Sequence, residues 1–126
     1  MKYRNILLID DDEDDQEIFL TALSEVNSSI KFEGLYDARD ALNKLSKKEL
    51  FPDAIFLDLN MPVMNGFQFL ERVKHKDFLK DIPVIIYTTS SQINTIKRAK
   101  DLGAHEFITK PSKYKDLVNI LRSILS

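Results

Sequence analysis

Five short apolar runs alternate along this chain with segments of helical period, and this alternation limits the possible folds more than any other feature. The runs lie near residues 5–9, 30–35, 54–58, 83–88 and 105–109. Strands that alternate with helices favour βα units and a parallel sheet. The first, third and fourth runs are continuously apolar, as strands covered on both faces are, whereas IKFEGL and HEFIT alternate as edge strands do. The sequence therefore predicts an α/β fold, a doubly wound five-stranded parallel sheet in the order 2-1-3-4-5 with five helices.

Four of the helical segments carry an apolar stripe, with apolar residues three or four positions apart. The stripes are Ile18, Phe19, Ala22, Leu23 and Val26; Ala38, Ala41, Leu42 and Leu45; Phe67, Leu70 and Val73; and Tyr114, Leu117, Val118, Leu121 and Leu125. The segment 91–101 differs, because its only apolar residues are Ile93, Ile96 and Ala99. A helix this polar buries little surface, so we expect it to shift at little cost.

Length and composition predict one ordinary domain spanning residues 1–126. The 18 basic residues are spread among 20 acidic ones, which argues against direct contact with nucleic acid. The chain has no cysteine, so disulfides and thiolate metal sites are excluded. The apolar stretch at the N-terminus is four residues long, too short for a signal peptide or a membrane span, and we expect a cytoplasmic protein without membrane contacts.

Polar residues with useful chemistry stand where four of the apolar runs end. Asp10 and Asp11 follow the first run, Asp58 the third, Thr88 the fourth and Lys110 the fifth. Ligands of parallel sheets bind outside the carboxyl ends of the strands, so these side chains are expected to meet in one crevice. Three carboxylates repel one another unless a cation neutralises them, and Mg²⁺ is typically shared between a few carboxylates and a phosphate. The sequence therefore predicts a site for Mg²⁺ and a phosphoryl group.

The acidic turn DDDEDDQE also admits simpler interpretations. Helix capping and the helix dipole account for its other acids, Asp12, Glu13, Asp14 and Asp15. A calcium-binding EF-hand loop is excluded, because Asp15 stands where glycine is needed and Thr21 where glutamate is needed.

Lys110 and Thr88 complete the predicted crevice. Lys110 can bind phosphate as a point charge and pair with Asp58, and a cis peptide bond to Pro111 is one hypothesis for how its side chain is aimed. Thr88 offers a hydroxyl that can donate a hydrogen bond to a phosphoryl oxygen. The crevice would then contain a donor that responds to phosphorylation.

The motifs LLIDDD, IFLDLNMPVMNG, VIIYTT and GAHEFITKP occur in this order, and with them the chain resembles a response-regulator receiver domain of two-component signalling, of the stand-alone type similar to chemotaxis regulators. The resemblance covers essentially all 126 residues and implies the flavodoxin-like form of the fold. It also implies that Asp58 is the phosphoryl acceptor, Thr88 the switch hydroxyl and Lys110 the charge-neutralising lysine. The metal ligands it implies are Asp10, Asp11, Asp58 and the backbone carbonyl of Asn60.

The resemblance further implies a mode of signalling. A sensor histidine kinase or a phosphotransfer protein supplies the phosphoryl group, and the chain is an acceptor rather than a dedicated enzyme. The output surface is the helix near 91–101, the fifth strand and the last helix, which contacts a downstream target protein and could also support a homodimer. Phe107 stands where the family has a rotating aromatic residue, but it lacks the hydroxyl of tyrosine. Asn60 and Ser90 flank the approach of a hydrolytic water and are expected to tune dephosphorylation.

Three other classes of protein compete with this interpretation. A flavodoxin would need a neutral loop after the first strand to hold the FMN phosphate, and here that loop is acidic. A phosphatase of the haloacid dehalogenase type would need an acid two residues after Asp58, where this chain has Asn60. A receiver-like docking module that works without phosphorylation remains the main alternative.

Overall fold

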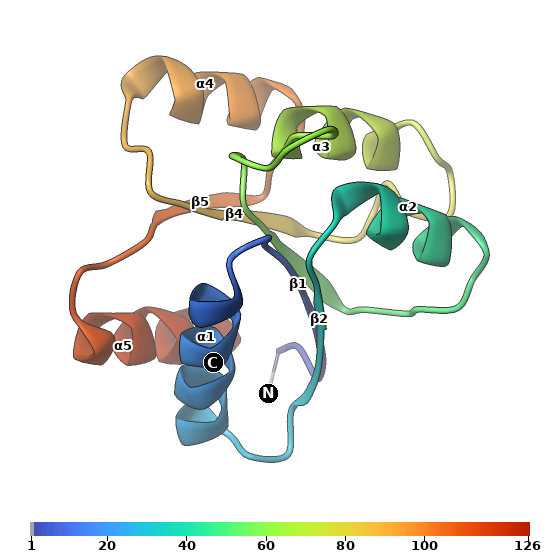
Figure 1. Ribbon diagram of the computed structural model, residues 1–126. Helices are drawn as coiled ribbons and strands as arrows, with labels where there is room; N and C mark the ends of the chain where they lie inside the picture. The colour runs from blue at the N-terminus through green and yellow to red at the C-terminus, as the bar shows by residue number, and fades with distance from the viewer. Residues whose placement is uncertain (1) are drawn as a thin grey trace.

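The computed structural model describes residues 2–126 and consists of a central parallel sheet with helices on both faces (Figure 1). The strands are β1 (Asn5–Ile9), β2 (Lys31–Leu35), β3 (Ala54–Leu57), β4 (Val84–Thr88) and β5 (Glu106–Thr109). The helices are α1 (Glu13–Val26), α2 (Ala38–Ser46), α3 (Gly66–Lys74), α4 (Ile93–Asp101) and α5 (Tyr114–Leu125). The strand order is β2-β1-β3-β4-β5, which confirms the predicted topology and both predicted edge strands. No helix in the described part of the chain is long and apolar enough to cross a membrane.

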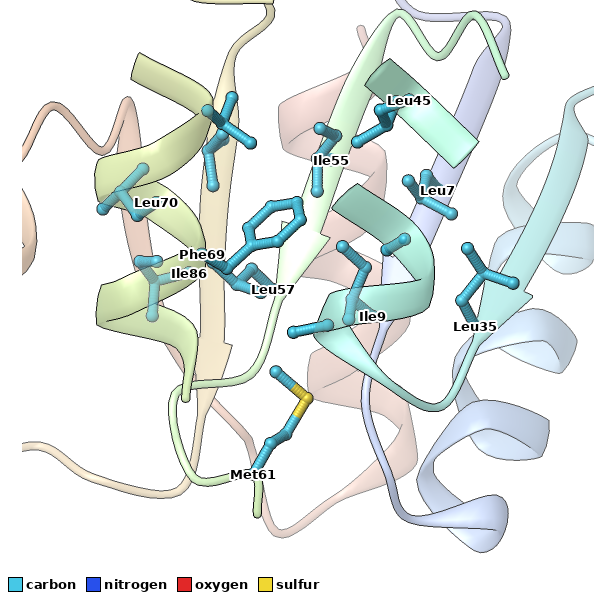
Figure 2. Close-up of a cluster of buried hydrophobic side chains, with 14 of the residues drawn as sticks. Leu7, Ile9, Leu35, Leu45, Ile55, Leu57, Met61, Phe69, Leu70 and Ile86 are labelled. Atoms are coloured by element: carbon cyan, nitrogen blue, oxygen red, sulfur yellow. The ribbon is translucent and has the colours of Figure 1, made fainter. Parts of the chain in front are cut away.

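The two faces of the sheet carry separate cores, which explains why the central strands are continuously apolar. Figure 1 shows α1 and α5 on one face and α2, α3 and α4 on the other. Successive side chains of a strand point to opposite faces. Accordingly, Leu7 and Ile9 of β1 pack towards α2 and α3 (Figure 2), while Ile6 and Leu8 pack with the residues of α1 and α5.

The apolar stripes locate the helices correctly but not every buried side chain. Ile18 and Tyr114 belong to predicted stripes, yet their exposed fractions are 46% and 42%. Conversely, Phe69 lies outside the predicted stripe of α3 and is fully buried beside Leu57 and Ile86 (Figure 2). The stripe of α3 is thus wider than the three-residue pattern indicated.

The helix α4 has the fewest buried residues of the five helices, as its polar sequence predicts. Ala99 is its only buried residue, and the side chain of its N-cap residue, Gln92, makes no capping hydrogen bond. A cation–π contact joins it to α3, with the Arg98 guanidinium 4.1 Å from the centre of the Phe67 ring. A helix held by so few buried contacts can move without disrupting the core.

Candidate functional site

The carboxyl ends of β1 and β3 place Asp10 and Asp58 next to each other. The Asp58 amide donates a hydrogen bond to the Ile9 carbonyl oxygen at 3.0 Å, and the Asp10 amide donates to the Leu35 carbonyl oxygen at 3.1 Å. These bonds continue the ladders of β1 with its two neighbours for one residue beyond the strands. The two acids therefore lie where the strand order reverses, the usual binding position in such sheets.

Three carboxylates meet at this point, as the sequence predicts. Asp10, Asp11 and Asp58 each offer one oxygen, and these oxygens lie within 4.8 Å of one another. Asp10 and Asp58 are buried, whereas Asp11 is exposed. Carboxylate oxygens are hard ligands, and two buried carboxylates with a third open to solvent fit an ion such as Mg²⁺, which keeps several of its waters.

Burial of Asp10 shapes the electrostatics of this cluster. The Asp10 side chain is fully buried, and this loss of solvation raises the pKa of its carboxyl above the ordinary value. Hydrogen bonds from Lys110 and from the Asp12 amide act in the opposite direction, while the nearby charge of Asp58 raises the pKa further. In the absence of a metal ion, the site therefore disfavours the ionised form of Asp10, even with Lys110 beside it.

Replacing Asp10 with asparagine is expected to stabilise the metal-free protein at pH 7. The folded state binds the Asp10 proton at a higher pH than the unfolded state does, so between these two pKa values stability falls as pH rises. Ionised Asp10 thus lowers the free energy of unfolding at neutral pH, and Asp10→Asn should raise it by about 1 kcal/mol. Lys110 keeps Asp15 and Asp58 as partners in this variant.

Urea unfolding in EDTA at pH 7 measures this change. The matched control is Asp81→Asn, which removes an exposed carboxylate from a distant loop and should change stability by less than about 0.5 kcal/mol. Equal or lower stability of Asp10→Asn relative to the parent protein would contradict the expectation.

Lys110 is the cation of the site. Its Nζ lies 2.8 Å from Asp10 Oδ2, 2.7 Å from Asp15 Oδ2 and 3.5 Å from Asp58 Oδ2. Burial works against the ammonium, but hydrogen bonds to Asp10 and Asp15 outweigh it, so the pKa of Lys110 is raised and the group stays charged. The ammonium also lies 5.3 Å from the centre of the Tyr87 ring, where burial raises the pKa of the phenol to about 12.

The hypothesis of a cis peptide bond between Lys110 and Pro111 is wrong. No cis peptide bond occurs in the described chain, in keeping with the general preference of X-Pro bonds for trans. The lysine is aimed instead by its surroundings. Its amide donates a 2.7 Å hydrogen bond to the Thr88 carbonyl oxygen, and its side chain reaches the three carboxylates.

Thr88 and Asn60 line the other side of the crevice. Thr88 is completely buried at the end of β4, and its Oγ1 accepts a 3.4 Å hydrogen bond from Asn60 Nδ2. The Asn60 amide donates to Asp58 Oδ1 at 3.3 Å. Asn60 therefore bridges the Asp58 carboxylate and the Thr88 hydroxyl through its backbone and its side chain.

Two residues of the site were not recognised from the sequence. The sequence pattern indicates a helix-capping role for Asp15, but its carboxylate contacts Lys110. The capping role falls to Asp12, whose Oδ1 accepts from the amides of Asp14 and Asp15. Gln16 was not singled out, although it stands three residues before Phe19 on the apolar stripe. A polar residue on the apolar face of a helix predicts a buried side chain with hydrogen-bond partners, and this signal would have identified Gln16.

Gln16 ties the start of α1 to the ends of β1 and β2. Its Nε2 donates to the carbonyl oxygens of Leu8, Asp10 and Leu35 at 3.4, 3.0 and 2.9 Å. Its Oε1 is buried without a hydrogen-bond partner in the described chain and faces Gly34, where any Cβ would collide with it. The backbone of Asp10 is therefore fixed from two directions.

Phe107 lies away from the acidic crevice, on β5. It is half-buried against the core beneath α3 and α4. Together with Ile96 of α4 and Ala104 it lines a cavity of about 240 Å³ between α4 and β5. This cavity offers space next to the ring.

Comparisons of sequence place this arrangement among known proteins. A family model described as the response regulator receiver domain matches residues 6–122. The chain is 28% identical over 123 residues to the probable methanogenesis regulatory protein FilR2 of Methanothrix harundinacea, which covers 94% of this chain and 79% of that protein. It is 30% identical over 122 residues to the phosphate regulon transcriptional regulatory protein PhoB of Escherichia coli. That match covers 97% of this chain but only 52% of PhoB.

Comparisons of structure agree. The phosphorylated cyanobacterial phytochrome response regulator RcpA superposes with a TM-score of 0.88 at 28% identity, covering 97% of this chain and 91% of that one. The Mn²⁺-bound form of response regulator Rcp1 has a TM-score of 0.82 at 28% identity, with coverages of 96% and 91%. The chemotaxis response regulator CheY4 of Vibrio cholerae has a TM-score of 0.81 at 29% identity, with coverages of 96% and 98%.

Proposed function

Because this chain belongs to the response regulator receiver domain family, we propose that it accepts a phosphoryl group on Asp58 and passes the resulting signal on through contacts with other proteins. The observation that carries this proposal is the convergence of Asp58, two further carboxylates and the Lys110 ammonium at the switch point of the sheet. A phosphoryl acceptor needs a nucleophile, charge neutralisation and a fixed geometry, and these residues provide them.

The Asp58 carboxylate acts as the nucleophile of the proposed reaction. One of its oxygens attacks the phosphorus of a phosphohistidine on a sensor kinase or a phosphotransfer protein. An O–P bond forms as the N–P bond breaks, and the histidine nitrogen leaves with the bonding electrons and is then protonated. The hydrogen bond from the Asn60 amide to Asp58 Oδ1 fixes the orientation of the carboxylate for an in-line approach.

Asp10, Asp11 and Asp58, with the backbone carbonyl of Asn60, would hold Mg²⁺ beside the acceptor. When bound there, the ion supplies positive charge that offsets the charge of the transferring group. Lys110 supplies further positive charge, with its Nζ 3.5 Å from Asp58 Oδ2. The chain thereby promotes its own phosphorylation without being a dedicated enzyme, and Asn60 and Ser90 flank the approach of the water that reverses it.

Thr88 links the proposed chemistry to the surface. Its hydroxyl would leave Asn60 and donate a hydrogen bond to an oxygen of the new phosphoryl group, drawing the loop between β4 and α4 inwards. The weakly anchored α4 and the cavity beside Phe107 allow the surface formed by α4, β5 and α5 to respond. This surface would contact a downstream target protein or a second copy of the chain.

Removal of the metal is expected to stop phosphorylation. The protein is incubated with acetyl phosphate and Mg²⁺, and its intact mass should increase by one phosphoryl group. With EDTA in place of Mg²⁺, the crowded carboxylates repel the anionic donor and the rate should fall at least about 100-fold. No added mass in the presence of Mg²⁺ would reject the proposal and favour a docking module that works without phosphorylation.

A further inference from the structure

Lys110 contacts Asp10 and Asp15 more closely than it contacts the proposed acceptor. Its Nζ is 2.8 Å from Asp10 Oδ2 and 2.7 Å from Asp15 Oδ2, but 3.5 Å from Asp58 Oδ2. The resting position of the ammonium is therefore on the α1 side of the crevice. A phosphoryl group on Asp58 would therefore have to compete with Asp10 and Asp15 for this ammonium.

Of the two closer contacts, the one with Asp15 is easier to release. Asp10 is fully buried, and its Oδ1 accepts from the Asp12 amide while its carbonyl oxygen accepts from Gln16. The Asp15 side chain is 31% exposed and lies in the first turn of α1, where water and the helix dipole can stabilise its charge without Lys110. A partly exposed ion pair is weak and can be exchanged for another.

We propose that Asp15 is a positioning residue that holds Lys110 away from Asp58 in the resting state and so limits how readily Asp58 accepts a phosphoryl group. This inference rests on the function proposed above. Asp15 competes with the phosphoryl oxygens for the same ammonium, and it is not needed as a metal ligand. By holding the Lys110 ammonium, Asp15 lowers the rate at which Asp58 is phosphorylated.

The Asp15→Asn variant is expected to accept phosphoryl groups from acetyl phosphate about threefold faster than the parent protein, the factor typical of a partly exposed ion pair. The dissociation constant of beryllofluoride, a phosphoryl mimic, should fall by about the same factor in the presence of Mg²⁺. Asp15→Glu keeps the charge and should restore the parental values. Intact mass measured over time gives the phosphorylation rates. Binding of the mimic is measured by tyrosine fluorescence, because Tyr87 lies beside Lys110.

Two controls separate positioning from general repulsion. Asp14→Asn removes a charge from the same turn, where no hydrogen bond or ion pair within residues 2–126 engages the Asp14 carboxylate, and it should leave the rate unchanged. In a Lys110→Ala background, Asp15→Asn should also have no effect, because the competing cation is gone. An equal gain in Asp14→Asn, or a gain that persists without Lys110, would overturn the inference.

The inference and the proposed function fail in different ways. If the parent protein gains no phosphoryl mass, the proposed function itself is rejected. If the parent protein is phosphorylated but Asp15→Asn reacts at the parental rate or more slowly, Asp58 remains the acceptor and the role of Asp15 is rejected. A rate gain in Asp15→Glu as large as that in Asp15→Asn would also reject it, because the charge would then be irrelevant.

Discussion

Asp58→Asn is expected to abolish phosphorylation completely. The amide has nearly the shape of the carboxylate and keeps an oxygen that can accept from the Asn60 amide, so the fold should persist. It is not a nucleophile at neutral pH, and no other carboxylate of the crevice is both buried and held by the end of β3. Intact mass after incubation with acetyl phosphate and Mg²⁺ should equal that of the untreated variant.

Asp53→Asn is the matched control for this experiment. Asp53 precedes β3 as Asp58 follows it, so the two acids stand at opposite ends of one strand. Asp53 is exposed, and its Oδ2 accepts hydrogen bonds from the amides of Arg4 and Asn5, which an asparagine oxygen can also accept. This variant should be phosphorylated like the parent protein. Phosphorylation of Asp58→Asn to the parental extent would show that the acceptor lies elsewhere.

Lys110→Ala is expected to lower the rate of phosphorylation by about 100-fold, since removal of a preorganised charge from a transition state typically costs a factor of this size. The loss also leaves the buried carboxylates of Asp10 and Asp58 without an ammonium partner, so the metal-free variant should be less stable. Mg²⁺ should restore much of that stability, because it replaces the missing positive charge. Rates are compared by intact mass at saturating Mg²⁺.

Lys115→Ala controls for the loss of a lysine. Lys115 is exposed on α5, and its removal should leave both the rate and the stability unchanged. Circular dichroism in Mg²⁺ establishes that Lys110→Ala is folded before the rates are compared. A folded Lys110→Ala variant with the parental rate would exclude the lysine from the reaction.

The order of the strands could be predicted because a strand that is buried on both faces has an apolar residue at every position. A strand between neighbours, such as ILLI of β1, has no solvent-facing position, and an edge strand such as KFEGL of β2 does. The same topology then brings Asp10, Asp58 and Lys110 together, and each of them lies in the predicted crevice.

The missed residues depend on details that no strand or stripe pattern records. Asp15 contacts Lys110 from the first turn of α1, where the sequence alone does not separate an acid that favours the helix dipole from one that pairs with a distant lysine. The trans bond before Pro111 is the ordinary form of an X-Pro bond, and the side-chain contacts that position Lys110 exist only in the folded chain. Phe69 is buried because the packed α3 places it in the cluster with Leu57 and Ile86.

The three hydrogen bonds of the Gln16 amide make one wall of the crevice stiff, because they couple the start of α1 to the ends of β1 and β2. The opposite wall, from Thr88 to α4, is joined to its surroundings by longer side-chain contacts, the 3.4 Å bonds of Asn60 to Thr88 and of Thr109 to the Ser90 carbonyl oxygen, and Ala99 is the only buried residue of α4. Under the proposed function, a phosphoryl group on Asp58 would attract groups of both walls, and the wall with fewer buried contacts would be displaced. The metal ligands would then stay in position while α4 moves. Phosphorylation could therefore change the surface at α4 without disturbing the geometry of the metal site.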